Sequence, residues 1–492
     1  MKNFKKNRTV LDLSTLETAV RITRSNGATE KSTSYMKNCI HHKDDSQKDF
    51  FKKILLCFYS VAPLLCVILF GFGFAHAAEI RTVTLDEAIS IAMDKNRDIE
   101  KAREYVRYVE GKYVEERAAA LPQLSLNGFA GIAKDNSQGV MYGGTAAPLQ
   151  YSRTADVSLS QPLYTWGKIG AAIRAAEAGL KTADDQLRLF RQAAVRDVTT
   201  VFYDVLLAKE LHNAARENLE QKKRLLDEAK QRYAAGTATD YDVLAADVAV
   251  QNAYPATIRS ENAIAAARHQ LRFLLALGGQ EVDATGTLDT KFTTPPNYDQ
   301  ALESARSKRP ELSDLRHRIG IYSELVTIAE AENKPRLDFK GSAGWHWLDI
   351  RESTALGGSS NGSAWSAGLF FSFPFFDGLK GSGKAAQAIS DLHSKQIDEA
   401  RLLESIALEI RTNRDALKEA ADIVQALSGT VRQAERLVQM ARNGYELGVK
   451  IRLELDDAQL NLVQAKSNLA RAQRDYRVAQ VNLLWAMGVA GE

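Results

Sequence analysis

Gly444-Tyr445-Glu446-Leu447-Gly448-Val449-Lys450 is a predicted turn, and the helix expected after it carries a regular apolar stripe as far as Gly488. The stripe advances by three and four residues and alternates large side chains with alanine. This spacing is typical of a helix that packs lengthwise against another helix in a supercoil. Its members are Leu455, Ala458, Leu462, Ala465, Leu469, Ala472, Tyr476, Ala479, Leu483 and Ala486.

The same unit occurs a second time, about 212 residues earlier in the chain. An earlier turn is followed by a matching stripe, which consists of Val243, Ala246, Val250, Ala253, Thr257, Ser260, Ile264, Ala267, Leu271 and Leu274. Corresponding landmarks in the two halves are Pro122 and Pro335, Tyr233 and Tyr445, and Gly236 and Gly448. The sequence therefore predicts two internal repeats, over residues 78–290 and 291–492.

Residues 1–77 are predicted to be an N-terminal extension and signal peptide that are removed. Two lysines precede an apolar run over 54–74, and small residues end the run, so cleavage is expected after Ala77. A membrane anchor is the alternative, because the apolar run is longer than the core of most signal peptides. Met36 is a second possible start of the chain.

Cysteine content and charge exclude several classes of protein. Cys39, Cys57 and Cys66 all lie within residues 1–77, so the remaining chain can form neither disulfides nor thiolate metal sites. The whole chain has 64 Lys and Arg against 61 Asp and Glu. Residues 1–77 hold 12 of these basic and 6 of these acidic residues, which leaves 52 against 55 and a net charge of −3. This balance gives no argument for binding nucleic acid.

After each of the two corresponding prolines the hydropathy pattern changes from a helical period to a period of two. Strands are therefore expected at 123–133, 154–163, 336–348 and 364–374. A tilted strand of about ten residues is long enough to cross a bilayer. Trp345, Trp347 and Trp365 lie near the loop ends, where they could form an aromatic girdle at the membrane interface. The alternative is a small soluble β-sandwich.

Two long helices are expected at 168–233 and 380–445, because neither segment contains a proline. Each would be about 99 Å long at about 1.5 Å per residue. Shorter helices, among them 240–277 and 452–487, would lie stacked beside each long one. Pro255 predicts a kink or a lost hydrogen bond in the helix at 240–277.

Four strands are too few to close a barrel within one chain, since about eight is the minimum. Open strand edges cannot face lipid, so a membrane sheet of this size requires further copies of the chain. Three copies would give twelve strands and a tube of helices that continues from the barrel. The expected fold class is therefore mainly α with a small β part.

The ordered set of segments, present in both halves, resembles the TolC family of trimeric outer-membrane efflux and secretion ducts. The resemblance covers residues 80–488 and includes the segments Leu121-Pro122-Gln123-Leu124-Ser125-Leu126, Ser160-Gln161-Pro162-Leu163 and Arg232-Tyr233-Ala234-Ala235-Gly236. It implies a homotrimer in the cell outer membrane of a Gram-negative bacterium, in contact with lipid. Each chain would give four strands to a trimeric 12-stranded transmembrane β-barrel that continues into a long periplasmic α-helical barrel.

The resemblance also implies partners and a gate at the periplasmic end. The partners would be a periplasmic adaptor (membrane fusion) protein and an inner-membrane pump or ABC transporter. Glu454 and Asp457 fall on the positions of an acidic ring, where three copies would place carboxylates that attract cations and repel anions. The alternative is that both residues only solvate the first turn of a helix, where the helix dipole favours acids.

Tyr445, Lys450 and Asp242 fall on positions that tie the inner helix pair to the outer one. The family commonly has arginine where this chain has Lys450, and lysine lacks the planar fork that binds a carboxylate through two hydrogen bonds. Gly236 and Gly448 would lie at the tips of the two turns, where the adaptor is expected to make contact.

A segment that resembles a nucleotide-binding loop lies between a predicted strand and a predicted helix. Gly378-Leu379-Lys380-Gly381-Ser382-Gly383-Lys384-Ala385 lacks the Ser or Thr that would hold magnesium after the lysine. The histidines after residue 77 show no metal-ligand spacing with acids, and no catalytic set emerges, so neither enzyme activity nor a cofactor is expected.

These observations predict a passive duct that is gated at its periplasmic end, for drugs, metal ions or exported proteins. The alternative is a structural coiled-coil protein of the periplasm or cell surface that forms no pore.

Overall fold

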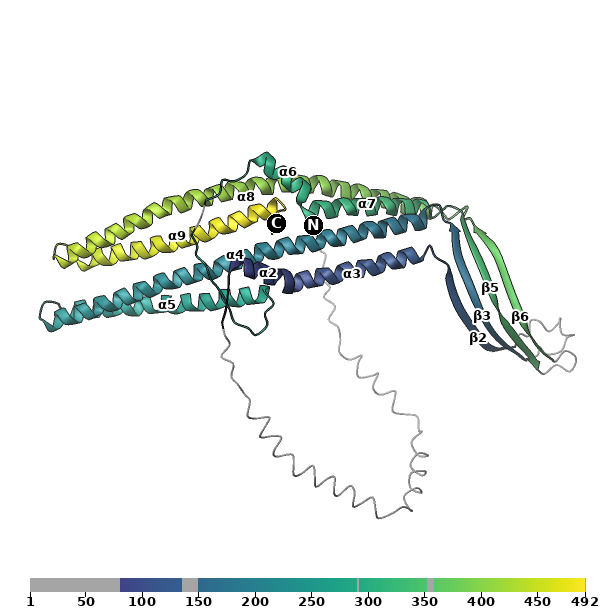
Figure 1. Cartoon of the computed structure of the whole chain (residues 1–492), viewed down its shortest axis with the longest axis horizontal. Coiled ribbons are helices and arrows are strands. Elements are labelled where there is room, and N and C mark those ends of the chain that lie inside the picture. Colours follow the sequence, from purple (N-terminus) through teal and green to yellow (C-terminus); the bar gives the residue numbers. More distant parts are fainter. Residues whose placement is uncertain (1–79, 135–148, 290–291, 352–357, 492) are drawn as a thin grey trace, which may run out of the picture. The chain divides into compact units, whose positions relative to one another are not determined.

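The computed structural model describes residues 80–134, 149–289, 292–351 and 358–491. Within these ranges the chain is mainly helical, with a four-stranded sheet and a second, small sheet (Figure 1). No helix in the described ranges has a stretch that is long and apolar enough to cross a membrane. The predicted signal peptide, its cleavage site after Ala77 and all three cysteines lie outside the described residues.

Each half of the chain contains one 67-residue helix and several shorter ones. The first half has α2 (Leu85–Lys95), α3 (Arg97–Ala118), the long α4 (Lys168–Ala234) and α5 (Asp240–Leu274). The second half has α6 (Tyr298–Lys308), α7 (Pro310–Glu330), the long α8 (Lys380–Glu446) and α9 (Arg452–Ala486). The helix α4 packs against α3 and α5 of its own half and also against α7 and α9. It therefore joins the two repeats.

The two residues before each long helix have left-handed backbone conformations. Trp166 and Gly167 precede α4 with φ angles of 49° and 82°, and Gly378 and Leu379 precede α8 with φ angles of 69° and 68°. Glycine takes this conformation without strain, so each corner lets a strand lead directly into a helix. The helix α5 runs without interruption through Pro255, which has no N–H to give to the helix.

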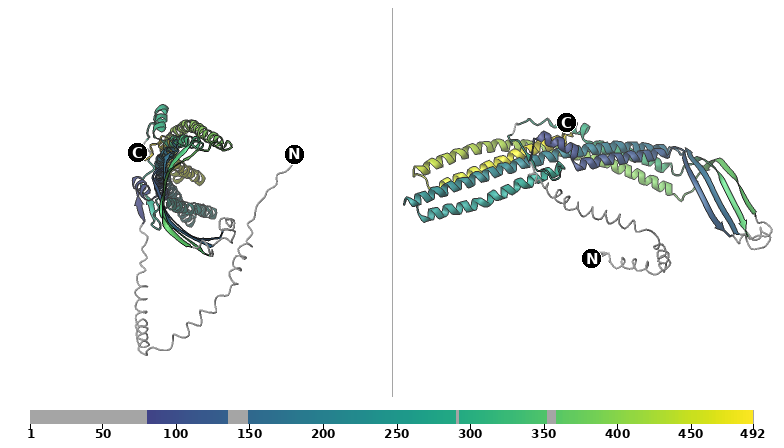
Figure 2. Two further views of the ribbon diagram at one scale, coloured as in Figure 1. Left: turned by 90° about the vertical axis from the view of Figure 1, so that its right-hand side faces the viewer. Right: turned by 60° about the horizontal axis from the view of Figure 1, so that its bottom comes forward.

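The larger sheet is antiparallel throughout, with strand order β2-β3-β5-β6. Its strands are β2 (Gln123–Ala133), β3 (Leu149–Tyr164), β5 (Arg336–Arg351) and β6 (Gly358–Ser372), and Figure 2 shows that the sheet is curved. Because β2 and β5 begin where β3 and β6 end, all four connections to helices leave one end of the sheet. In the part of the chain that the structure describes, β2 and β6 each pair with a single neighbour.

Two strands begin earlier than expected. The sequence predicts starts at 154 and 364, whereas β3 begins at Leu149 and β6 at Gly358. The additional residues of β6 are all serine, asparagine or glycine, but their backbones continue the ladder, as in the pairing of Ser360 with Leu348 of β5. Pairing with an already formed strand therefore outweighs the turn preference of these residues.

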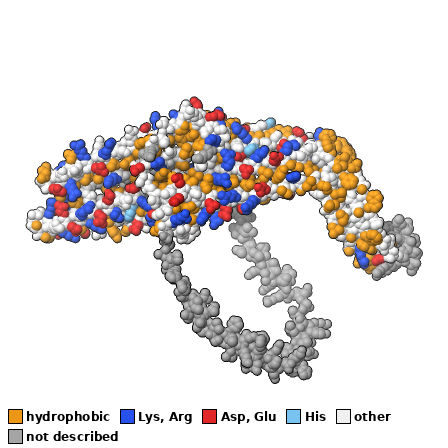
Figure 3. All heavy atoms as spheres, viewed as in Figure 1, with side chains coloured by type: hydrophobic (Ala, Val, Ile, Leu, Met, Phe, Trp, Pro, Cys, Tyr) orange, Lys and Arg blue, Asp and Glu red, His pale blue; other side chains and the backbone are white. Residues whose placement is uncertain are grey.

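The two faces of the sheet differ in polarity. Apolar side chains gather on the strands, whereas charged side chains cover the helices (Figure 3). On β2 the even-numbered Leu124 and Leu126 are exposed, and on the other face Ser125 and Asn127 form hydrogen bonds to β3. Alternation of side chains along a strand produces this division. The sheet thus exposes an apolar face that nothing else in the described chain covers.

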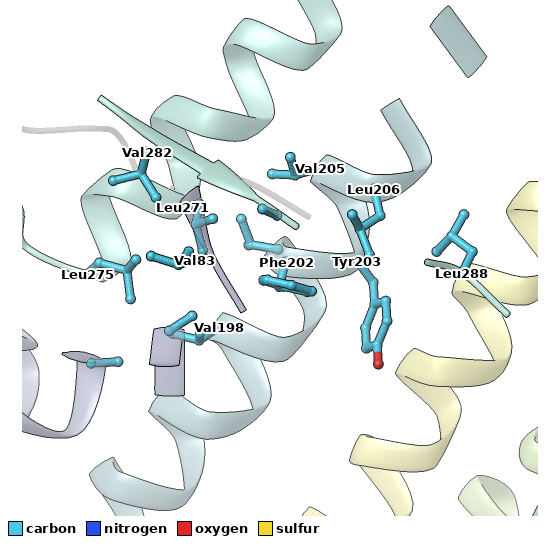
Figure 4. Packing of buried hydrophobic residues seen from close by; sticks show 14 of the residues in the cluster. Val83, Val198, Phe202, Tyr203, Val205, Leu206, Leu271, Leu275, Val282 and Leu288 are labelled. Carbon is cyan, nitrogen blue, oxygen red and sulfur yellow. The ribbon is translucent and has the colours of Figure 1, made fainter. Parts of the chain in front are cut away.

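A small parallel sheet and the middle of α4 form the largest buried apolar cluster. β1 (Arg81–Val83) pairs with β4 (Val282–Ala284), and Figure 4 shows Val83, Val282 and Leu271 in one cluster with α4 residues such as Phe202. Asp283 of β4 is held by Lys209 at 2.8 Å and by Arg268 at 2.9 Å. The sequence gives no signal for this sheet, because its strands have three residues each.

Candidate functional site

The turns between the paired helices have the same backbone in both repeats. Gly236 and Gly448 have φ angles of 77° and 75°, which L-residues with a Cβ rarely adopt. The N–H of Thr237 donates to the Arg232 carbonyl at 2.8 Å, and the N–H of Val449 donates to the Gly444 carbonyl at 2.9 Å. These bonds end each long helix in the manner of a Schellman motif, so both glycines are required by the turn.

Glu454 lies in the first turn of α9, beside the second turn. One of its carboxylate oxygens accepts the Ile451 N–H at 3.3 Å, and the other is 3.2 Å from Lys450 Nζ. Asp457 lies almost one helical turn further along and is exposed. Both carboxylates are therefore on the solvent side of this single chain, and Glu454 also stabilises the helix start.

The three predicted tie residues have partners other than one another. The Asp242 carboxylate accepts the Thr239 N–H at 2.8 Å and the Thr239 hydroxyl at 2.7 Å, and these hydrogen bonds hold the pKa of Asp242 below its usual value. Tyr445 packs under the Arg232 guanidinium, 4.8 Å from its ring centroid, and Lys450 pairs with Glu454. Asp242 is the third residue of α5, so its side chain folds back onto the helix cap and does not reach across to Lys450.

A different set of side chains joins the two turns. Lys222 Nζ of α4 is 2.7 Å from Asp456 Oδ1 of α9, and both side chains are largely buried. Arg452 of α9 donates to the backbone carbonyl of Asp242 at 3.1 Å and lies 3.7 Å from Asp456. This group was not predicted from the sequence. The four-residue spacing of Arg452 and Asp456 is visible in the sequence, but Lys222 lies 234 residues from Asp456.

Large apolar side chains are exposed around both turns. They are Tyr241 and Leu244 near the first turn, and Leu447, Val449, Ile451 and Leu453 near the second. Isolated exposed apolar residues are common on proteins, whereas a group of this kind marks an interaction surface. The tips of the two hairpins therefore have the character of a contact site.

The segment that resembles a nucleotide-binding loop has internal partners. The Gly381 N–H donates to Asp377 Oδ2 at 2.6 Å, and Lys384 Nζ is 2.6 Å from Glu332 Oε1. The corner thus uses its own carboxylate where a phosphate would lie in a nucleotide site. Among the described residues, no group of His, Cys, Asp and Glu is arranged to hold a metal ion.

Comparison with known proteins identifies this architecture. The chain is 23% identical over 402 residues to the outer membrane protein TolC of Escherichia coli (strain K12), with 77% of each chain covered. It is 24% identical to the alkaline protease secretion protein AprF of Pseudomonas aeruginosa, covering 76% of this chain and 78% of that protein. The crystal structure of the Campylobacter jejuni CmeC outer membrane channel has the same fold, with a TM-score of 0.74 at 16% identity, over 82% of this chain and 86% of that one.

The sequence model described as "Outer membrane efflux protein" matches the chain twice, over residues 88–277 and 301–489. The two matches correspond to the two repeats, each with its long helix and its pair of strands. The chain belongs to the outer membrane efflux protein family.

Proposed function

We propose that the chain is the outer-membrane exit duct of a tripartite efflux or type I secretion system, through which substrates pass without chemical change. The observation that carries this proposal is the four-stranded sheet, which has an exposed apolar face, open edges at β2 and β6, and helices attached at one end only. A structural coiled-coil protein that forms no pore does not require a sheet with an exposed apolar face and unpaired edges.

Three copies of the chain would close a barrel of twelve strands. At the end nearest the helices β2 begins and β6 ends, so β2 of one copy beside β6 of the next would be antiparallel, as all neighbours within the sheet are. Such pairing would satisfy the open edges, whose N–H and C=O groups cannot remain unpaired in lipid. The apolar face would contact the lipid, and the long helices of three chains would form the periplasmic barrel.

The exposed apolar groups at Gly236 and Gly448 are proposed contacts for a periplasmic adaptor protein, which would in turn link the duct to an inner-membrane pump or ABC transporter. Coiled-coil hairpins dock through apolar residues at helical spacing, and both turns present such residues. The chain is 24% identical to the alkaline protease secretion protein AprF and 23% identical to the toluene efflux pump outer membrane protein TtgC of Pseudomonas putida, so the proposal covers both kinds of substrate.

The proposed gate lies at the same turns. Glu454 and Asp457 would form an acidic ring when three copies come together, and six carboxylates around one opening would bind multivalent cations. Tyr445, Lys450 and Asp242 would support the turns through the contacts described above, with Arg452 as the residue that reaches Asp242.

Planar-bilayer conductance of the purified protein tests both proposals. The wild type should form channels, which a trivalent cation blocks from the helical side. Glu454→Ala combined with Asp457→Ala should weaken this block at least tenfold. The loss of the exposed Lys450–Glu454 pair should cost about 0.3–0.5 kcal/mol, and the loss of the hydrogen bond from the Ile451 N–H should cost about 1 kcal/mol, so the fold should be retained.

Glu446→Ala is the matched control, because Glu446 is also exposed near the same turn and pairs only with Arg442 of its own helix among the contacts described. The control should retain the block. An unchanged block in the double variant would refute the acidic ring, and a wild-type protein that forms no channel would refute the duct.

A further inference from the structure

A cavity of about 520 Å³ lies where the four-stranded sheet meets the helices (Figure 1). Three basic residues line it: Lys168 is the first residue of α4, Lys334 lies between α7 and β5, and Arg336 is the first residue of β5. Apolar residues, among them Ile169 of α4 and Ile328 of α7, line it as well. Below we name the space lined by these five residues the cationic cavity.

The strand residues that line the cationic cavity belong to the polar face of the sheet. Gln123 and Ser160 are ladder partners, and both lie two residues from Ser125 and Ser158, whose hydroxyl groups meet at 2.6 Å. Side chains two residues apart on a strand share a face. In the proposed barrel this face would enclose the interior, because the opposite face is apolar. A ligand of the cationic cavity would therefore come from inside the duct.

Two of the cations in this cavity lack an acidic partner. Arg336 Nε is 2.8 Å from Asp338 Oδ1, whereas neither Lys168 nor Lys334 forms an ion pair with another described residue. Because α4 begins at Lys168, the positive end of its helix dipole lies at the same place.

The acidic residues that line the cavity do not cancel this charge. Glu332 is already bound by Lys384, whose Nζ lies 2.6 Å from its Oε1. Glu116 of α3 is the other acidic lining residue, and it has no ion pair among the described contacts. Two unpaired lysines against one unpaired glutamate leave a charge of +1, which favours a ligand with a single negative charge.

The cationic cavity continues into an apolar groove over α4. Ala172 and Ile328 line both spaces, and the groove has a volume of about 380 Å³ between α3 and α7. Small residues of α4 such as Ala176 line it, together with Tyr105 and Tyr108 of α3. The two tyrosine rings stack with centroids 6.2 Å apart, and both remain exposed. Below we name the space lined by Ala172, Ala176, Tyr105 and Tyr108 the tyrosine groove.

We infer that the cationic cavity and the tyrosine groove together bind an organic anion with a flat apolar body. Its sulfonate or carboxylate group would lie between Lys168 and Lys334, and its body would lie in the tyrosine groove. Sites for small molecules typically have volumes of about 300–1,000 Å³, apolar walls and a few charged groups, and the two spaces fit this description. The inference rests on the proposed duct for the path of the ligand, and it names a class of substrate that the wall of the duct would bind.

Isothermal titration calorimetry tests the inference on the full protein in phosphatidylcholine nanodiscs, with empty nanodiscs as the blank. The probes are naphthalenesulfonate and naphthylmethylammonium, which share one apolar body and carry opposite charges. The sulfonate should bind at least fivefold more tightly than the ammonium probe, because only the sulfonate can accept hydrogen bonds from the two lysines.

Two variants separate the contributions of charge and shape. Lys168→Gln combined with Lys334→Gln should weaken sulfonate binding at least tenfold without weakening binding of the ammonium probe. The fold should be retained, because both lysines are exposed and form no ion pair among the described residues. Ala176→Leu should weaken sulfonate binding about fivefold or more, because the larger side chain fills the tyrosine groove.

The chain offers matched controls for both variants. Lys101→Gln combined with Lys181→Gln removes two exposed lysines from α3 and α4 that line neither space, so it causes the same change in net charge. Ala386→Leu makes the same substitution as Ala176→Leu at an exposed position of α8. Neither control should change the affinity for the sulfonate.

The lipid composition distinguishes a ligand inside the duct from a lipid headgroup. When phosphatidylglycerol replaces part of the phosphatidylcholine, the ratio of wild-type to double-lysine-variant affinity should stay the same. This ratio cancels the general repulsion between an anionic bilayer and an anionic probe. A ratio that falls toward one would assign the cavity to lipid phosphate and refute the inference.

The remaining outcomes are equally direct. Equal affinity for the two probes would refute the inference, as would wild-type sulfonate binding in either the double lysine variant or Ala176→Leu. If binding follows the expected pattern while the purified protein forms no channel in planar bilayers, the anion site stands and the proposed duct fails.

Discussion

Tyr476→Phe is expected to loosen the connection between the repeats at one defined point. Tyr476 is fully buried on α9, and its hydroxyl oxygen accepts the Thr293 N–H at 2.8 Å. The ring of Phe292 meets the Tyr476 ring edge-on, with centroids 5.4 Å apart. The Thr293 hydroxyl lies 3.3 Å from the same oxygen, and Gln480 of α9 donates to this hydroxyl at 3.5 Å. Several contacts therefore fix the segment that leads into α6 to α9, and Tyr476 provides the acceptor for the Thr293 N–H and the aromatic contact.

The size of the effect follows from what each substitution removes. Phenylalanine preserves the ring and its packing but leaves the partly buried Thr293 N–H without this acceptor, which should cost about 1–2 kcal/mol. Exchange of the Thr293 amide with solvent deuterium should then be roughly 5-fold to 30-fold faster. Tyr476→Ala also removes the ring from the cluster with Leu417 and Leu483 and should cost about 3–5 kcal/mol.

Hydrogen exchange with resolution at single amides measures this effect directly. In the phenylalanine variant faster exchange should be confined to the residues around Thr293, whereas in the alanine variant it should spread to α8 and α9. Tyr254→Phe is the control, because Tyr254 is exposed on α5. Wild-type exchange at Thr293 in the Tyr476→Phe protein would show that the hydrogen bond does not hold the segment.

Two further results are expected. Gly344→Ala would place a methyl carbon against the Ala155 carbonyl oxygen and the Asp156 backbone, so it should sharply reduce the yield of folded protein in the membrane fraction. Gly362→Ala should not, because nothing lies within 4 Å of its added methyl carbon. Burial alone would raise the pKa of Asp283, but hydrogen bonds from Lys209 and Arg268 lower this pKa overall. The ionised Asp283 therefore stabilises the fold fully above about pH 4, and this stabilisation is lost as the pH falls through the lowered pKa. The thermal midpoint should therefore drop in acid, and by less in Asp283→Asn; an equal drop in both proteins would exclude this role.

Much of the helical architecture could be predicted because its signals are local. A long helix is expected over 380–445, and α8 spans Lys380–Glu446, since the segment has no proline before the glycine of its turn. The helix expected over 240–277 ends earlier, at Leu274, because Ala276 and Gly278 adopt positive φ angles. Helix periodicity in the sequence does not reveal such a backbone reversal in advance.

Contacts between distant segments could not be predicted in the same way. The sequence places Asp242, Tyr445 and Lys450 near the turns, but it does not determine which carboxylate each cation meets. That choice depends on the antiparallel register of α4 and α9, which brings Lys222 to Asp456 and leaves Asp242 to cap its own helix. Similarly, the ladder partners of residues 149–153 become evident only when β5 is in place.

The helix caps that follow the two turns differ between the two repeats. Thr239 exchanges hydrogen bonds with Asp242 at the start of α5, whereas Ile451, at the corresponding place before α9, has no side-chain oxygen to offer. Absence of a capping oxygen typically costs a helix about 1 kcal/mol. The start of α9 should therefore be less stable than the start of α5. The two copies of the duplicated unit thus begin their second helices with unequal stability, and the first turn of α9 should fray more readily than the first turn of α5.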